Sequence, residues 1–291
     1  MIWVDLANAT INGIVIGLLL ALPALAVTLV FGIARFPNAA TGDFMTFGAY
    51  TVVAAKSLLA LPLAIGVAMA CALTALLSLF FYWWVFRALV RRSPVASLIV
   101  SIGIALVVRS TITFFAGQSQ YTIEVPLVRA WNFDGVRIVP TDLYIAGVAV
   151  TALVLTFCLL HLTPLGRRMR AVADNMELAR ASGINVGRVM ITLFAIVGFY
   201  CGLGGVLIGI KAVVLPELGW ELLLLLFAAV ILGGIGSPLG AIIGMLVFSV
   251  SQEIASLWVG ASYKIVFAFF LLLGVLLLRP QGILGKVRAV R

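Results

Sequence analysis

Long apolar segments dominate this chain, and short polar segments separate them. An α-helix needs about twenty residues to cross a bilayer, and most of the apolar segments are close to that length. None shows the alternation of apolar and polar positions over about ten residues that a membrane β-barrel requires. The pattern therefore predicts an all-α, polytopic membrane helical bundle with eight or nine spans, over residues 10–31, 39–60, 63–86, 95–115, 143–162, 189–212, 218–235, 239–258 and 265–278.

One apolar segment contains an interruption. Residues 218–235 end in a glycine-rich stretch that is closed by Pro238, and this composition disfavours a continuous helix. Broken helices at membrane depth usually line a cavity, where the freed backbone groups find partners or water. We expect a broken or partly re-entrant helix near Gly233–Pro238. A pathway or gating role is as well supported as close helix packing for its members Gly233, Gly234, Gly236 and Ser237.

The composition supports residence in a membrane. The chain is 64% hydrophobic and only 10% charged, far from the mixture found in soluble domains. In water it would expose large apolar patches. The cysteines Cys71, Cys158 and Cys201 lie within apolar segments, which predicts packing residues and no disulfide or metal site. No basic residue precedes Arg35, so the first apolar segment is expected to be a retained helix rather than a cleaved signal peptide.

Basic residues are distributed unequally between the two sides of the predicted bundle. Positive charges are retained on the cytoplasmic side of bacterial inner-membrane proteins, so we expect an external N-terminus and a cytoplasmic C-terminus. The net charge of +9 follows from this asymmetry and does not indicate nucleic-acid binding. The residues expected on the cytoplasmic side are Arg35, Arg87, Arg91, Arg92, Arg167, Arg168, Arg170, Arg180, Arg188, Arg279, Lys286, Arg288 and Arg291.

Two connections within this single predicted domain, residues 1–291, are too long to be simple turns. The external loop 116–141 contains β-prone residues around a turn sequence at Asn132–Gly135, which predicts a small hairpin that can touch an extracytoplasmic partner. In the cytoplasmic loop 163–188, Asp174 or Asn175 can cap a short helix that ends at Gly183. Its first turn contains Glu177, near the positive end of the helix dipole. One face of this helix is compact and can insert into a groove on a soluble partner; it consists of Leu178, Ala181 and Ser182.

A few polar residues lie within or beside the apolar segments. At the start of the second predicted helix, a capping role and a role in translocation are equally supported for Asn38, Thr41, Gly42 and Asp43. Arg109 and Glu253 lie inside the fourth and eighth segments, where a charge is costly unless it is paired or faces water. Because both are expected in the outer half of the membrane, we predict that they contact each other.

Several ordered motifs resemble one family. The pattern Glu177-x-Ala179-x-x-x-Gly183 resembles the coupling motif by which permeases of ABC importers dock onto their nucleotide-binding subunits. The string from Arg170 to Val186 is similar to the LivH/LivM family of branched-chain amino acid permeases. Three more segments, which extend the resemblance over nearly the whole chain, are similar to characteristic stretches of that family: 17–50, 228–240 and 279–284.

The resemblance implies a translocation subunit and no enzyme. It implies alternating access together with a second, LivM-like permease subunit, two cytoplasmic ATP-binding subunits that bind ATP and magnesium, and a periplasmic solute-binding protein. No cofactor is expected in this chain. The ATPase-coupling residues would be Asp174, Glu177, Leu178, Ala179, Ser182 and Gly183.

The residues leave alternatives open. Residues 39–41 and Asp43 depart from the family pattern, in which an aromatic residue, a His or Gln and a Glu are more usual, so urea or a short-chain amide remains a possible cargo. An ion-coupled secondary transporter or channel is a rival, although it predicts several acidic or histidine residues within the spans. A non-transporting membrane scaffold would not require the interruption near Gly233–Pro238.

Overall fold

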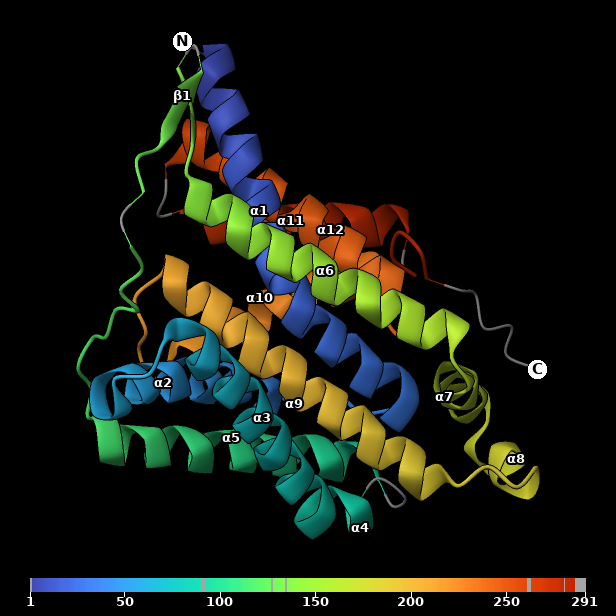
Figure 1. The fold of residues 1–291 in the computed structure, drawn as a ribbon. Helices are drawn as coiled ribbons and strands as arrows, with labels where there is room; N and C mark the ends of the chain where they lie inside the picture. Colours follow the sequence, from blue (N-terminus) through green and yellow to red (C-terminus); the bar gives the residue numbers. More distant parts are fainter. Residues whose placement is uncertain are drawn as a thin grey trace.

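The computed structural model describes residues 2–89, 93–126, 128–133, 135–260, 263–279 and 281–285, and it is predominantly helical (Figure 1). The α-helices are α1 Ile2–Leu29, α2 Ala40–Leu59, α3 Leu63–Phe81, α4 Arg87–Leu89, α5 Pro94–Ala116, α6 Pro140–Leu162, α7 Pro164–Asp174, α8 Met176–Ala181, α9 Val186–Lys211, α10 Leu218–Gly233, α11 Pro238–Val259 and α12 Lys264–Leu278. Two π-helical turns follow α1 and α3, namely η1 Val30–Ala34 and η2 Tyr82–Phe86. The predicted all-α bundle is therefore confirmed.

Each of the nine predicted apolar segments coincides with a helix, but not every helix is long and apolar enough to span a membrane. Within the described part of the chain, 6 helical stretches are long and apolar enough. They are Trp3–Ala34, Leu63–Leu89, Pro94–Ala116, Pro140–Leu162, Val186–Lys211 and Pro238–Val259. Helix α10 has only 16 residues, which at 1.5 Å per residue span about 24 Å, less than the hydrocarbon thickness of about 30 Å. The structure thus supports 6 candidate crossings among the described residues, and the predicted count of eight or nine is not confirmed.

The centre of the bundle is formed by α9, which packs against α1, α2 and α3, while α1 lies along α11. In Figure 1, α9 crosses the middle of the molecule, with α2, α3 and α5 on one side and α1 and α6 on the other. Glycines allow these helices to approach closely. A Cβ atom on Gly48 would lie 2.7 Å from the Cα of Gly202, so α2 and α9 touch through their backbones. Any larger side chain at Gly48 would therefore force the two helices apart.

The two ends of the bundle differ in structure. At the N-terminal end, the strands β1 Trp131–Phe133 and β2 Val136–Ile138 form the predicted hairpin, paired antiparallel with Asn132 opposite Arg137. The side chain of Asn8 ties this hairpin to α1. The opposite end, which we name the α8 end, carries α7 and α8 (Figure 1).

Among the described residues, six of the basic residues predicted to share one side lie at the α8 end. They include Arg35 after α1, three arginines of α7, Arg180 of α8 and Arg188 of α9. Lys211 pairs with Asp142 near the start of α6, at the other end, with 2.8 Å between Nζ and Oδ2. Arg91, Arg92, Lys286, Arg288 and Arg291 lie outside the described residues.

Candidate functional site

Helix α7 is anchored to the end of α6. The hydroxyl of Thr163 accepts a hydrogen bond from the backbone N–H of Gly166 at 3.2 Å, and Pro164 occupies the first helical position, so the helix begins with a side-chain cap. Its buried face includes Met169 and Val172. The guanidinium of Arg170 donates to the carbonyl of Leu160 in α6. The position of α7 is thus fixed relative to a membrane-spanning helix.

Helix α8 begins and ends where local sequence signals place it. The Oδ1 atom of Asn175 accepts from the N–H groups of Glu177 and Leu178, each at 3.0 Å, so Asn175 is the N-cap and Asp174 is the last residue of α7. Gly183 has φ +81°, a left-handed conformation that glycine adopts without a Cβ penalty. The N–H of Ile184 donates to the carbonyl of Ala179 at 3.0 Å, which completes a Schellman motif.

The faces of α8 have opposite environments. Ala179 is buried against the rest of the bundle, whereas Leu178 is 64% exposed. Glu177, Ala181 and Ser182 are exposed as well. An apolar side chain on an exposed helix beside small residues is a surface suited to a protein partner. The predicted docking face is therefore accessible in the structure.

Arg35 connects the end of α1 to the junction between α7 and α8, a contact that no sequence motif indicates. Its backbone is left-handed, with φ 61°, which is uncommon for a residue other than glycine. One terminal nitrogen of its guanidinium donates to the carbonyl oxygens of Ala173 and Asp174, at 3.1 Å and 2.9 Å. These are the last carbonyls of α7, where a cation is favoured by the helix dipole. The end of α1 thus holds the junction between α7 and α8.

From Arg35 the chain enters the bundle without helical structure. Phe36 and Asn38 are buried, and the N–H of Ala39 donates to the hydroxyl of Ser101 at 3.0 Å. Ser101 lies seven residues after the start of α5, or roughly 10 Å along that helix. Helix α2 therefore starts inside the bundle, and Asn38 accepts from the N–H of Ala40 at 3.1 Å. Within the described part of the chain, the Nδ2 atom of Asn38 has no hydrogen-bond partner.

The start of α2 carries a buried charge pair. The carboxylate of Asp43, with 0% exposure, accepts two hydrogen bonds from Arg109 of α5, at 3.0 Å from Nε and 3.1 Å from Nη2. The Arg109 guanidinium also lies over the ring of Trp220, 4.6 Å from its centroid. This bidentate geometry is the arrangement in which a carboxylate and an arginine bind most strongly.

The predicted contact between Arg109 and Glu253 is wrong. Glu253 of α11 accepts a hydrogen bond from Asn12 of α1 at 3.0 Å, while Arg109 is held by Asp43. The physical reason is the packing of the helices, because α5 packs on α2 whereas α11 lies along α1. Similar depth in the membrane does not make two residues neighbours.

The start of α2 meets the start of α10. The N–H of Gly219 donates to the hydroxyl of Thr46 at 2.9 Å. A Cβ atom on Gly42 would overlap the carbonyl oxygen of Gly219, so the two backbones are in direct contact. Thr41 is also fully buried here. The positive ends of two helix dipoles thus converge beside the charge pair. We name the set formed by the partly buried Arg109 and the buried residues Asn38, Thr41, Gly42, Asp43 and Gly219 the α2–α10 junction.

The glycine-rich interruption is a turn between two helices. Gly234 and Gly236 have positive φ, and the hydroxyl of Ser237 caps α11 by accepting from the N–H of Gly240 at 3.1 Å. The N–H of Gly236 donates to Thr28 of α1 at 3.1 Å. After α12, the chain returns to this turn, since Leu284 donates to the carbonyl of Gly233 at 3.0 Å. The structure thus places Gly233–Ser237 next to the end of α1 and apart from Asp43.

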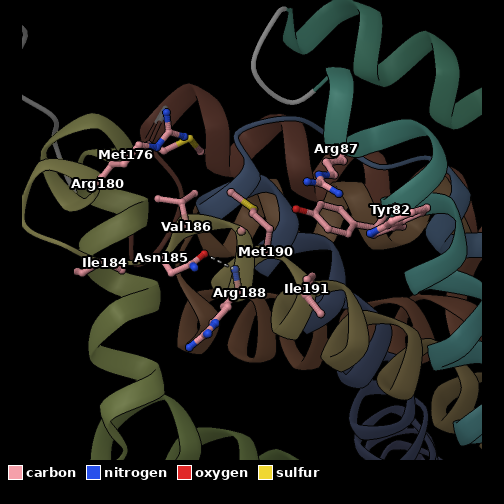
Figure 2. A pocket seen from close by; sticks show the side chains of 12 residues that line it. Tyr82, Arg87, Met176, Arg180, Ile184, Asn185, Val186, Arg188, Met190 and Ile191 are labelled. Atoms are coloured by element: carbon pink, nitrogen blue, oxygen red, sulfur yellow. Dashed lines mark hydrogen bonds between the residues drawn. The ribbon is translucent and has the colours of Figure 1, made fainter.

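A cavity of about 500 Å³ opens beside α8, between the start of α9 and the π-helical turn η2 (Figure 2). Sequence periodicity gives no signal for it, because its walls come from segments about one hundred residues apart. In the described part of the chain, no cluster of three or more His, Cys, Asp and Glu residues lies in metal-binding geometry.

Comparison with known proteins assigns the family. The family model described as "Branched-chain amino acid transport system / permease component" matches residues 9–276. The chain belongs to this permease family. It is 29% identical to the high-affinity branched-chain amino acid transport system permease protein LivH of Salmonella typhimurium, over 94% of each chain. It is 30% identical to the corresponding protein BraD of Pseudomonas aeruginosa, over 95% of this chain and 94% of BraD.

The match to the branched-chain permease family includes α8, Arg35 and the α2–α10 junction, because residues 9–276 contain all of them. The resemblance noted in the sequence is thereby confirmed. Permease subunits are not enzymes, and the apolar helices indicate a multi-pass membrane protein.

Proposed function

We propose that this chain forms the translocation path of an ATP-driven importer for branched-chain amino acids, and that α8 is the surface on which an ATPase subunit docks. The observation that carries the proposal is the presentation of α8. It is capped at both ends, is exposed on the Leu178 face, and is bound to the end of α1 through Arg35. The membership in the permease family supports the same assignment.

The partners follow from this function. A second, LivM-like permease subunit would complete the path, two ATP-binding subunits would supply ATP and magnesium, and a periplasmic protein would deliver the solute. The α8 end, rich in arginine, would face the cytoplasm, and the N-terminus with its hairpin would face outward. The names of LivH and BraD support branched-chain amino acids as the cargo over urea or short-chain amides.

Movement of α8 would reach the membrane interior through Arg35. Arg35 donates hydrogen bonds to the carbonyls of Ala173 and Asp174, and only residues 36–39 separate it from the start of α2. We propose that the solute passes the α2–α10 junction and that the turn Gly233–Ser237 acts as a gate at the α8 end. Non-helical backbone at membrane depth is tolerated where it lines a path or is buried in protein.

Replacing Leu178 by aspartate is expected to weaken association with the ATPase subunit at least tenfold, about 1.4 kcal/mol. A charge at an apolar docking position must lose its water of hydration when the surfaces meet. The measurement is co-purification of the ATPase subunit with a tagged permease. Arg168→Ala, on the exposed surface of α7, is the matched control and should retain the subunit.

The same pair of variants tests the rival class. A secondary transporter acting alone predicts uptake that is independent of any ATPase subunit and indifferent to Leu178. If Leu178→Asp retains the ATPase subunit and takes up solute at the normal rate, α8 is not the docking surface.

A further inference from the structure

The cavity beside α8 has a mixed chemical character. Figure 2 shows Arg87 on one side and Arg180 on the other, with Met190 and Val186 between them. A third arginine, Arg188, completes its polar rim. The apolar part of the wall includes Trp83, Met176, Ile184 and Ile191. Such a combination suits a ligand that has an anionic head and an apolar body.

Among the described residues, no acidic side chain compensates the positive charge around the cavity. None of its 12 lining residues is acidic. Among the described residues, the salt bridges join other groups, and no carboxylate pairs with Arg87, Arg180 or Arg188. Arg87 lies over the ring of Trp83, 5.8 Å from its centroid. Three guanidinium groups around one cavity repel each other unless an anion lies between them.

The surroundings of the cavity have the features of a membrane interface. Trp83 and Trp84 are 66% and 72% exposed and lie at the end of the long helical stretch 63–89, where tryptophan marks the headgroup level of a bilayer. Ile191, in the second turn of α9, is exposed on the other wall. The exposed tryptophans therefore place the arginines at the expected depth of lipid headgroups, with the apolar wall directed toward the expected region of the acyl chains.

We propose that this cavity binds the phosphate headgroup of an anionic phospholipid. Guanidinium groups bind phosphate through paired, charge-assisted hydrogen bonds, and basic pockets between helices on the cytoplasmic side are suited to such headgroups. The volume of about 500 Å³ lies within the range of small-molecule sites, roughly 300–1,000 Å³. The acyl chains would lie along Trp83 and Ile191.

A lipid at this position would join α8 to the membrane-spanning part. Met176 and Arg180 belong to α8, whereas Arg87 continues the helical stretch 63–89. One bound headgroup would therefore restrain the docking helix relative to that stretch. This consequence for coupling rests on the proposed function, whereas the binding of the lipid does not.

The test measures lipid retention on the purified full-length chain. Native mass spectrometry after exchange into detergent containing phosphatidylglycerol or phosphatidylcholine counts the bound lipids. The double variant Arg87→Gln/Arg180→Gln removes two charges from the cavity, and Arg167→Gln/Arg168→Gln removes two charges from the exposed surface of α7 as a control. We expect at least tenfold weaker phosphatidylglycerol retention only in the cavity variant, with phosphatidylcholine unchanged.

Other results would overturn the proposal. Equal phosphatidylglycerol retention in both double variants means that the cavity is not the site. Binding of inorganic phosphate with no preference for phosphatidylglycerol means a free anion as ligand, and release of the lipid when the ATPase subunit docks assigns the cavity to that subunit. The variant Arg87→Lys/Arg180→Lys keeps both charges but lacks the planar guanidinium groups, so partial retention of phosphatidylglycerol is expected. Size-exclusion chromatography shows whether each variant is folded, and equal phosphatidylglycerol loss in folded Lys and Gln variants would contradict a contribution of the charge to binding. Because neither uptake nor ATP hydrolysis is measured, failure here leaves the proposed importer function testable by itself.

Discussion

Replacing Arg35 by alanine is expected to lower ATP-driven solute uptake at least tenfold while ATP hydrolysis by the docked subunit continues. Arg35 is the side chain that joins the end of α1 to the carbonyls of Ala173 and Asp174, immediately before α8. Its removal is expected to leave the proposed docking face of α8 intact, because Asn175 and Gly183 still cap that helix. The movement of α8 would no longer be passed efficiently to the start of α2.

The measurement compares uptake and ATP hydrolysis in the same proteoliposomes. Arg35→Lys keeps a cation near the two carbonyls, although it lacks the planar guanidinium, so partial recovery is expected. Arg167→Ala is the matched control, since Arg167 is exposed on α7, and should leave both rates unchanged. Loss of hydrolysis in parallel with uptake would show that Arg35 supports docking or folding instead of transmission.

Replacing Arg109 by alanine is expected to destabilise the fold by about 3–5 kcal/mol, the usual cost of leaving one partner of a buried ion pair alone. Asp43 is fully buried, and its carboxylate accepts two hydrogen bonds from Arg109. The double variant Asp43→Asn/Arg109→Gln removes both charges and should recover most of the lost stability, because replacement of a whole buried pair is often nearly neutral.

The measurement is the midpoint of thermal inactivation in detergent, followed by size-exclusion chromatography. Arg129→Ala, in the exposed external loop, is the control: it also removes one arginine and should leave the midpoint unchanged. Equal stability of Arg109→Ala and the native chain would contradict a structural role for the pair. A stable double variant with lost uptake would assign the pair to the translocation path.

Local signals in the sequence were sufficient to predict α8, the proposed docking helix. A capping side chain at Asn175 and a glycine at position 183 define the ends of α8 through contacts within a few residues, so no knowledge of the tertiary structure was needed. The apolar segments likewise predicted helices, since lipid leaves few other conformations to the backbone.

Contacts between distant segments were beyond prediction from one sequence. The partner of Arg109 was assigned by depth alone, whereas it is set by the packing of α5 on α2. The role of Arg35 requires that the end of α1 lie beside the end of α7, which its position in the sequence does not indicate. The glycine-rich stretch interrupts a helix, as predicted. Its position beside Thr28 is set by the packing of α1, which the sequence does not indicate.

The central claim is that this chain carries solute only when ATPase subunits drive it. The direct measurement is uptake of radiolabelled leucine into proteoliposomes that contain this permease, its partner permease and the solute-binding protein, with and without the ATPase subunits. We predict ATP-dependent uptake that disappears when those subunits are omitted. Leucine uptake at the same rate without them, driven by an ion gradient, would contradict the account.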